Sequence, residues 1–223
     1  MVQSAKDEIL GRLRAAPKET LPPRPYLPPL SELSLGKDEL ISKFTEILTG
    51  ETGVVHRVKN NREALDKLTQ VVKEEKLKCV MATTDSVIAP LNLPGWGKEQ
   101  AVNVLTPKDF ADRDSFKDAV FDQVQAGITG ADYAFAESGT LAVIHNKDQA
   151  RLVSLAPILH IAILPSDRIV SVYEPIIEKV FSNKDELPSQ FVFISGPSMT
   201  ADIQGHLFKG MHGPRKVIVI LIG

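Results

Sequence analysis

The chain has 223 residues, of which 43% are hydrophobic and 24% charged, a composition that is ordinary for a folded protein and excludes an intrinsically disordered one. Its 26 basic and 28 acidic residues leave a formal net charge of −2, so no overall field favours nucleic acid or an acidic membrane surface as a partner. The single cysteine, Cys79, excludes an internal disulfide and an iron–sulfur cluster built from this chain's own thiolates.

The first 36 residues predict an arm outside the core. Ile9, Leu10 and Leu13 recur at helical spacing, which favours a short amphipathic helix over residues 4–16. Charges interrupt this apolar pattern, unlike in a signal peptide, and no later segment is long and apolar enough to span a membrane, so we expect a cytoplasmic protein. Six prolines within residues 17–29 predict an extended segment that either wraps the body or a neighbouring subunit of a homo-oligomer, or forms a loose tail.

From residue 37 onward the pattern alternates between helix and strand. We expect helices over residues 38–49, 61–76, 114–125, 172–181 and 199–209. We expect strands over residues 53–58, 78–82, 102–105, 127–129, 133–136, 140–145, 158–164, 191–195 and 217–222. The last three are continuous apolar runs, which indicates strands covered on both faces.

This order predicts an α/β fold with a mostly parallel sheet covered by helices. The three closely spaced strands between residues 127 and 145 suggest a small antiparallel insert. No linker divides the body, so we expect residues 1–36 to form the arm and residues 37–223 one domain.

The stretch from Phe191 to Asp202 gives the strongest local signal, a buried strand followed by small residues and an expected helix. Backbone amides, the positive helix terminus and the hydroxyls of Ser198 and Thr200 could converge there on a carboxylate or phosphate. The structural alternative is that Gly196 only makes the turn and a hydroxyl only caps the helix.

A second signal lies at residues 210–215, where Gly210 and Gly213 flank His212. Glycines in such a pattern indicate unusual backbone dihedrals or close approach to a ligand. Arg215 could clamp a carboxylate or phosphate, and His212 could transfer a proton near neutral pH. In the alternative interpretation Gly210 is a helix C-cap, His212 a turn residue and Arg215 a surface cation.

A third signal spans residues 127–140, where small residues surround Asp132 and Glu137. Glu137 stands at an expected strand end before a Ser-Gly turn, and could act as nucleophile or general base if burial raises its pKa. It could equally accept hydrogen bonds from turn amides and fix the backbone.

The remaining candidates favour structural roles. His160 lies within an apolar run and is expected to be a hydrogen-bonded core residue. Trp96 is expected to be a packing residue, the alternative being an aromatic lid over a loop. His56, His145 and His206 have no ligand spacing, so no metal site is expected. The chain also lacks the GxGxxG and phosphate-loop lysine patterns, which argues against common dinucleotide and ATP sites.

Four motifs taken together resemble the LUD-domain family, and within it the lactate utilization protein C group. Their order and spacing match over residues 37–223. The motifs are Thr129–Asp132, Ala136–Thr140, Gly196–Ile203 and Gly210–Arg215. Ser138 and Met199 stand where many relatives have threonine and arginine, which leaves a cationic contact at position 199 without its usual side chain.

The resemblance implies a fold similar to the glucosamine-phosphate deaminase, ribose-phosphate isomerase and CoA-transferase group. It also implies a role in oxidising L-lactate to pyruvate together with iron–sulfur partner proteins, so that this chain itself binds no cofactor and the clusters lie on the partners. The alternatives are a stand-alone enzyme similar to CoA-transferases or sugar-phosphate isomerases, and a noncatalytic carboxylate-binding module.

The expected site residues follow from these motifs and fall into three groups. The catalytic candidates are Glu137 and His212. The candidates for binding a carboxylate or other anion are Gly196, Ser198, Thr200, Asp202, Gly213 and Arg215. The supporting residues are Thr129, Gly130, Asp132, Gly139 and Thr140.

Overall fold

The computed structural model describes residues 5–17, 34–182, 187–201 and 207–223. The chain divides into a unit up to Ser31 and a unit from Glu32 onward. In the first, the predicted helix is confirmed as α1 (Ala5–Ala15), which has no buried residue. Most of the predicted proline-rich segment lies outside the described residues.

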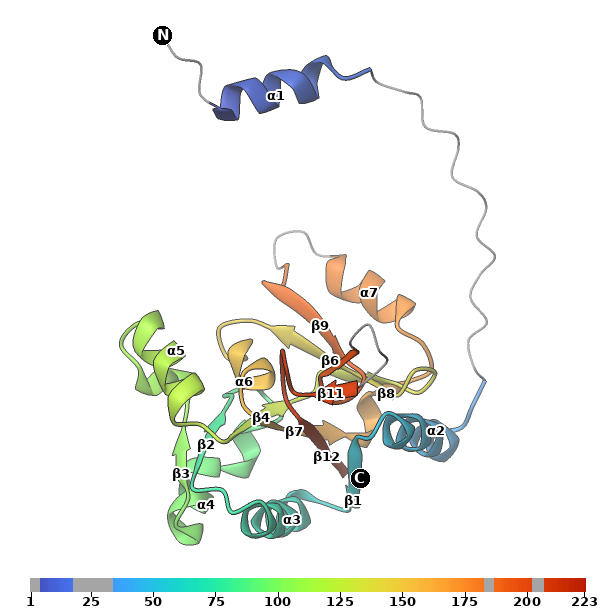
Figure 1. The fold of residues 1–223 in the computed structure, drawn as a ribbon. Helices are drawn as coiled ribbons and strands as arrows, with labels where there is room; N and C mark the ends of the chain where they lie inside the picture. The colour runs from blue at the N-terminus through green and yellow to red at the C-terminus, as the bar shows by residue number, and fades with distance from the viewer. Residues whose placement is uncertain (1–4, 18–33, 183–186, 202–206) are drawn as a thin grey trace. The chain divides into compact units, whose positions relative to one another are not determined.

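The body contains a six-stranded parallel sheet, the main sheet (Figure 1). Its strand order is β1 (Val54–Val58), β12 (Lys216–Ile222), β7 (Leu159–Pro165), β4 (Ala126–Gly130), β2 (Cys79–Ala82) and β3 (Asn103–Leu105). The mostly parallel sheet that the sequence predicts is therefore confirmed.

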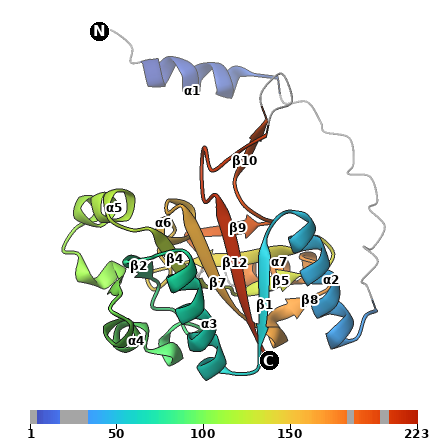
Figure 2. The same ribbon diagram turned by 60° about the horizontal axis from the view of Figure 1, so that its bottom comes forward.

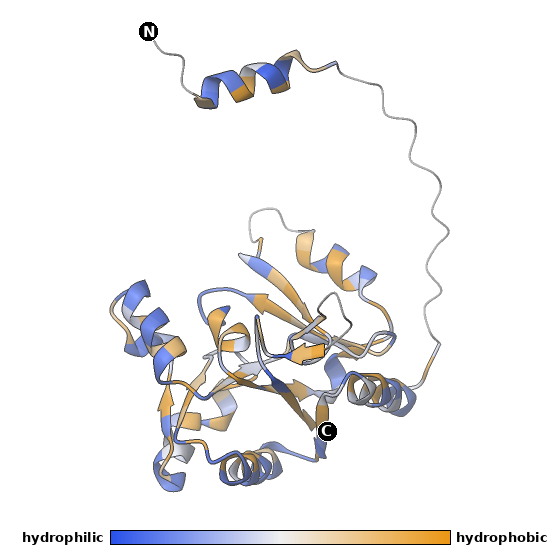
Figure 3. Ribbon diagram, viewed as in Figure 1, coloured by the Kyte–Doolittle hydropathy of each residue, from blue (hydrophilic) through white to orange (hydrophobic). Residues whose placement is uncertain are grey.

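Alternation along β12 shows how the two faces of the main sheet are covered. Ile218 and Ile220 pack in a core with α3 (Asn61–Glu74) and α4 (Leu93–Gln100). Val217 and Val219 face the opposite core, built from α2 (Lys37–Gly50) and a second sheet. Because successive strand side chains point to opposite faces, a strand covered on both sides must be apolar throughout. Figure 3 shows largely apolar strands and helices that carry both kinds of residue.

The second sheet has four strands, in the order β8 (Ile169–Val170), β5 (Tyr133–Phe135), β6 (Thr140–His145) and β9 (Gln190–Ile194). The predicted antiparallel insert exists, but β4 is not part of it, because β4 pairs in parallel with β2 and β7. The expectation that β9 is covered on both faces is wrong, since β9 lies at an edge and Phe193 is 45% exposed.

The remaining helices flank the sheets. They are α5 (Arg113–Asp122), α6 (Leu152–Leu155) and α7 (Glu174–Phe181), with short 3-10 turns at Ala89–Leu91, Pro107–Asp109 and Ser166–Arg168. The sequence did not predict α4, in which Trp96 is buried and donates a hydrogen bond from Nε1 to Thr69 Oγ1 at 2.9 Å. Trp96 is thus a packing residue. Among the helices described here, none combines the length and apolarity needed to cross a membrane.

The helix expected over residues 199–209 is wrong. The segment forms β10 (Met199–Ala201) and β11 (Leu207–Lys209), paired antiparallel as a ribbon that stands clear of the main sheet (Figure 2). A helix of that length would separate its ends by about 16 Å. The amide of Gly210 instead donates to the carbonyl of Ser198 at 2.8 Å, and only a hairpin brings the two ends together.

Candidate functional site

The two glycine-rich turns of the C-terminal half meet at the base of this ribbon. Besides the bond from Gly210, the amide of Ser198 donates to the carbonyl of Pro214 at 2.8 Å. Gly210 has a φ of 78°, and a Cβ there would lie 2.0 Å from Cγ of Arg215. Position 210 therefore requires glycine both for its dihedral and for the packing of the Arg215 stem. The alternative that Gly210 caps a helix is wrong, because the element that ends directly before it is the strand β11.

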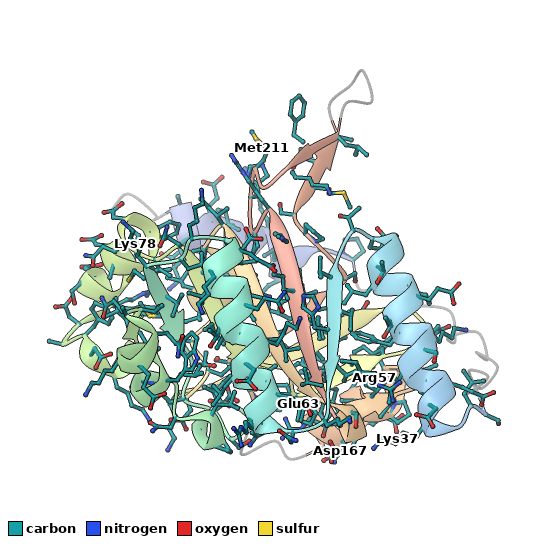
Figure 4. All side chains as sticks on the ribbon, turned by 90° about the horizontal axis from the view of Figure 1, so that it is seen from below. Lys37, Arg57, Glu63, Lys78, Asp167 and Met211 are labelled. Carbon is teal, nitrogen blue, oxygen red and sulfur yellow. The ribbon has the colours of Figure 1, made fainter. Side chains whose placement is uncertain are left out.

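A pocket of about 410 Å³ lies beside the 210–215 turn. We call it the amino-edge pocket, because its lining residues Ile158 and Arg215 directly precede the amino ends of β7 and β12. The amide of Arg215 donates a hydrogen bond to the carbonyl of Ile158 at 2.8 Å. His212 and Arg215 supply its polar lining, and Phe121, Leu152, Leu155 and Ile158 supply apolar walls. Figure 4 shows Met211, another lining residue, near the ribbon. Within the described part of the chain, no carboxylate forms an ion pair with Arg215.

The helix terminus expected to attract an anion at Ser198 is absent. Thr200 pairs with Phe208 in the ribbon, and neither Ser198 nor Thr200 lines the amino-edge pocket. Asp202 lies outside the described residues. The structure thus brings His212, Gly213 and Arg215 to one pocket.

A separate turn follows β5. Glu137 is exposed there, and its amide donates to the carbonyl of Ser171 at 3.0 Å. Thr140 Oγ1 accepts from Ser138 Oγ at 2.9 Å and lies 2.8 Å from Ser195 Oγ. The two catalytic candidates, Glu137 and His212, stand on different turns, and no hydrogen bond or ion pair between described residues joins them.

Gly139 and Gly196 dock these turns on the end of α2. Gly139 has a φ of 61°, and a Cβ there would lie 2.6 Å from the amide nitrogen of Leu48. A Cβ on Gly196 would lie 2.9 Å from the carbonyl oxygen of Glu51. Both contacts are with protein backbone, which accounts for these glycines by packing.

Three of the supporting residues, Thr129, Gly130 and Asp132, belong to a polar network at the carboxyl ends of β2 and β4. Thr129 Oγ1 lies 2.9 Å from Nε2 of His160, which is fully buried. The expectation of a hydrogen-bonded core histidine is confirmed, and burial lowers the pKa of His160 to about 4. Gln149 donates from Nε2 to the carbonyl of Gly130 at 2.7 Å.

Asp132 is the most perturbed acid of this network. Burial raises its pKa from 3.8 to about 6, and the charge of Asp85 adds to the rise, while the hydrogen bond from the Ile144 amide to Oδ2 at 2.7 Å opposes it. Its neighbour Asp85 accepts from Thr83 Oγ1 at 2.6 Å and from the amide of Gly130 at 3.2 Å. A carboxyl group with such a pKa can exchange a proton near neutral pH.

Three buried atoms of the network have no hydrogen-bond partner among the described residues: His145 Nε2, His160 Nδ1 and Gln149 Oε1. Nδ1 of His145 lies 3.0 Å from the carbonyl oxygen of Gln149. Since a carbonyl can only accept, Nδ1 carries the proton of the neutral ring and Nε2 is an unpaired acceptor. Burial lowers the pKa of His145, which favours that neutral form. Buried atoms of this kind are commonly satisfied by internal water.

Sequence reasoning missed a second pocket, of about 310 Å³, at the opposite edge of the main sheet. We call it the carboxyl-edge pocket. Thr83 and Thr84 follow the carboxyl end of β2, and Thr106 and Lys108 follow that of β3. The sequence feature that could have indicated this pocket is the presence of polar residues directly after short buried strands.

Comparison with known proteins agrees with this architecture. The family model of the LUD domain matches residues 41–222. A crystal structure of a DUF162 family protein from Deinococcus radiodurans has the same fold, with a TM-score of 0.63 at 22% sequence identity, covering 85% of this chain and 99% of that one. The chain therefore belongs to the LUD-domain family.

Within the family the chain is similar to proteins named lactate utilization protein C. The one from Halalkalibacterium halodurans is 30% identical, over 83% of this chain and 80% of the relative. The one from Deinococcus radiodurans is 28% identical, over 92% and 87% respectively.

Proposed function

We propose that this protein takes part in lactate utilization, as a subunit that binds a small carboxylate while L-lactate is oxidised to pyruvate. The names of its relatives support the pathway. The amino-edge pocket supports the ligand class, because it combines one cation with an apolar wall.

The carboxylate of the ligand would pair with Arg215, whose planar guanidinium can donate two parallel hydrogen bonds to it. The apolar walls Leu155 and Ile158 would contact the methyl group. His212 lines the same pocket, so it is a better candidate than Glu137 to take the hydroxyl proton.

Oxidation of lactate to pyruvate also releases the Cα hydrogen as a second proton, together with two electrons. We propose that iron–sulfur partner proteins accept the electrons and that the second proton passes to solvent. The chain has one cysteine, whereas such clusters are held by several thiolates. Burial raises the pKa of the Cys79 thiol, and Asn103 Nδ2 lies 3.7 Å from Sγ. A thiol with a raised pKa is a poor nucleophile and a poor ligand at neutral pH.

The test is lactate-dependent reduction of clusters in the purified complex, followed by electron paramagnetic resonance. Arg215→Ala should weaken the apparent lactate affinity about tenfold or more, because one charge-assisted contact is lost. Arg62→Ala, an exposed arginine on α3, is the matched control. Full activity of Arg215→Ala would refute the carboxylate site, and failure to co-purify with cluster-containing proteins would refute the subunit role.

A further inference from the structure

The carboxyl-edge pocket lies between the carboxyl ends of β2 and β3, next to a topological switch point of the main sheet. β2 and β4 are neighbours, but the chain leaves β2 outward through α4 to β3, whereas it leaves β4 through β5 and β6 to β7 on the other side. In open α/β sheets, connections that diverge in this way leave a crevice outside the strand ends where ligands bind. The amino-edge pocket lies at the opposite ends of the strands, so the two pockets are distinct.

The lining of the carboxyl-edge pocket includes hydrogen-bonding groups that remain free or weakly used. The Thr84 hydroxyl has only long contacts to Asp148, at 3.4 and 3.5 Å. The Asn92 side chain has no hydrogen-bond partner among the described residues. Ile88 and Leu93 add buried apolar surface beside these groups.

Lys108 is the cation of this pocket. Its Nζ lies 3.1 Å from Oδ1 of Asp148. An ammonium group has three donors, so Lys108 can hold Asp148 and a ligand oxygen together. The Asp148 backbone is fixed independently, because its carbonyl accepts from the amide of Thr84 at 2.8 Å.

Two other nearby acids are occupied by protein donors. Asp109 accepts at Oδ2 from the amide and the hydroxyl of Thr106, at 2.7 and 3.0 Å. Asp85 accepts hydrogen bonds from Thr83 Oγ1 and from the amides of Val87, Ile88 and Gly130 at 2.6 to 3.2 Å. A carboxylate has about four acceptor positions, so these four donors occupy the oxygens of Asp85 and leave it no free acceptor in the pocket.

We propose that the carboxyl-edge pocket is a second ligand site, which binds a small hydroxylated oxyanion. The oxyanion contacts Lys108, the hydroxyl groups contact Thr84 and Asn92, and the carbon skeleton lies against Ile88 and Leu93. A carboxylate and a phosphate share this chemistry, and the pocket size suits a molecule of a few carbon atoms.

The test is titration of the full chain with glycerate and with glycerol 3-phosphate, by calorimetry and by ¹H–¹⁵N NMR. We expect saturable binding of at least one probe, with shifts centred on the amides of Thr84 and Lys108. The probe that binds more tightly identifies the oxyanion. Binding of neither probe, or shifts confined to residues 210–215 with none at Thr84 and Lys108, would overturn the proposal.

Variants separate this site from the amino-edge pocket. Lys108→Ala should weaken binding about tenfold, whereas Lys98→Ala, an equal charge change on the exposed side of α4, should not. Asp148→Asn should strengthen binding by removing the competing carboxylate. Arg215→Ala should leave the glycerol 3-phosphate titration unchanged even if it abolishes lactate-dependent activity, whereas it should remove any glycerate binding at the amino-edge pocket, because glycerate resembles lactate. Wild-type affinity in Lys108→Ala would refute the assignment.

Discussion

Asp132→Asn is expected to change the pH dependence of stability in a way set by the buried network. Raising the pKa from 3.8 to about 6 makes the ionised carboxylate about 3 kcal/mol less favourable in the folded chain than in the unfolded one. Between these pH values the folded chain retains a proton that the unfolded chain has released. The free energy of unfolding contributed by Asp132 is therefore fully present below pH 3.8 and falls as pH rises toward 6.

His160 acts in the opposite direction over nearly the same range. Because its pKa is lowered from 6.5 to about 4, the unfolded chain binds a proton that the folded chain does not. The free energy of unfolding therefore rises with pH between about 4 and 6.5, also by about 3 kcal/mol. The lowered pKa of His145 adds to this rise.

In the wild type the effects of Asp132 and His160 on the free energy of unfolding should largely offset each other between pH 4 and 6, which leaves the rise contributed by His145. Each substitution should reveal the effect of the group that remains. Asp132→Asn keeps a carbonyl acceptor for the Ile144 amide, and should raise the free energy of unfolding by about 2–3 kcal/mol at pH 8 but by little at pH 4. His160→Gln should give a profile that falls with pH. Urea unfolding followed by circular dichroism at half-unit pH steps measures both.

Asp118→Asn, on an exposed position of α5, is the control for loss of a carboxylate. A difference between Asp132→Asn and wild type that stays constant from pH 4 to 8 would refute the reasoning. It would mean that Asp132 ionises in the folded chain as readily as in the unfolded one.

Two further substitutions test the packing of the body, the first at the amino-edge pocket and the second in the core beneath α2. Gly210→Ala should lower the free energy of unfolding by about 1–2 kcal/mol and weaken lactate binding, because the left-handed φ is strained and the new methyl displaces the Arg215 stem. Gly50→Ala is the control, because a Cβ there meets open space. In the same urea and ligand titrations it should change neither stability nor binding. Phe44→Ala should cost about 3–5 kcal/mol, since this side chain is fully buried between α2 and the sheets. Phe181→Ala, at a 42% exposed position, should cost clearly less, and equal losses would contradict the packing argument.

The elements that the sequence predicts well are those whose burial decides their pattern. β7 and β12 are buried on both faces, so their apolar runs are unambiguous. β9 has a similar run but lies at an edge, where Phe191, Phe193 and Tyr173 form edge-to-face contacts in place of a second apolar layer. Periodicity cannot distinguish these two environments, because both favour large apolar residues.

The error at residues 199–209 has a different origin. Met199 and Leu207 recur at helical spacing, but backbone contacts from Ser198 to Gly210 and Pro214 fix the path of the segment. Those contacts join residues 12 and 16 positions apart, beyond the reach of a pattern read over a few residues. The anion site expected at Ser198 and Thr200 depended on the positive terminus of this helix. Because the helix does not form, that argument for the site no longer holds.

The two pockets explain why the glycine-rich motifs pointed to only part of the surface. Gly210 is required by its left-handed φ and by the Arg215 stem, and a Cβ on Gly213 would lie 3.2 Å from Cβ of Ser198. The carboxyl-edge pocket needs no such close approach, so it is lined by threonines, an asparagine and Lys108, which are common surface residues with no motif value. Its recognition requires the strand order, because the pairing of β2 with β3 brings the residues that follow these two strands to the same edge of the main sheet.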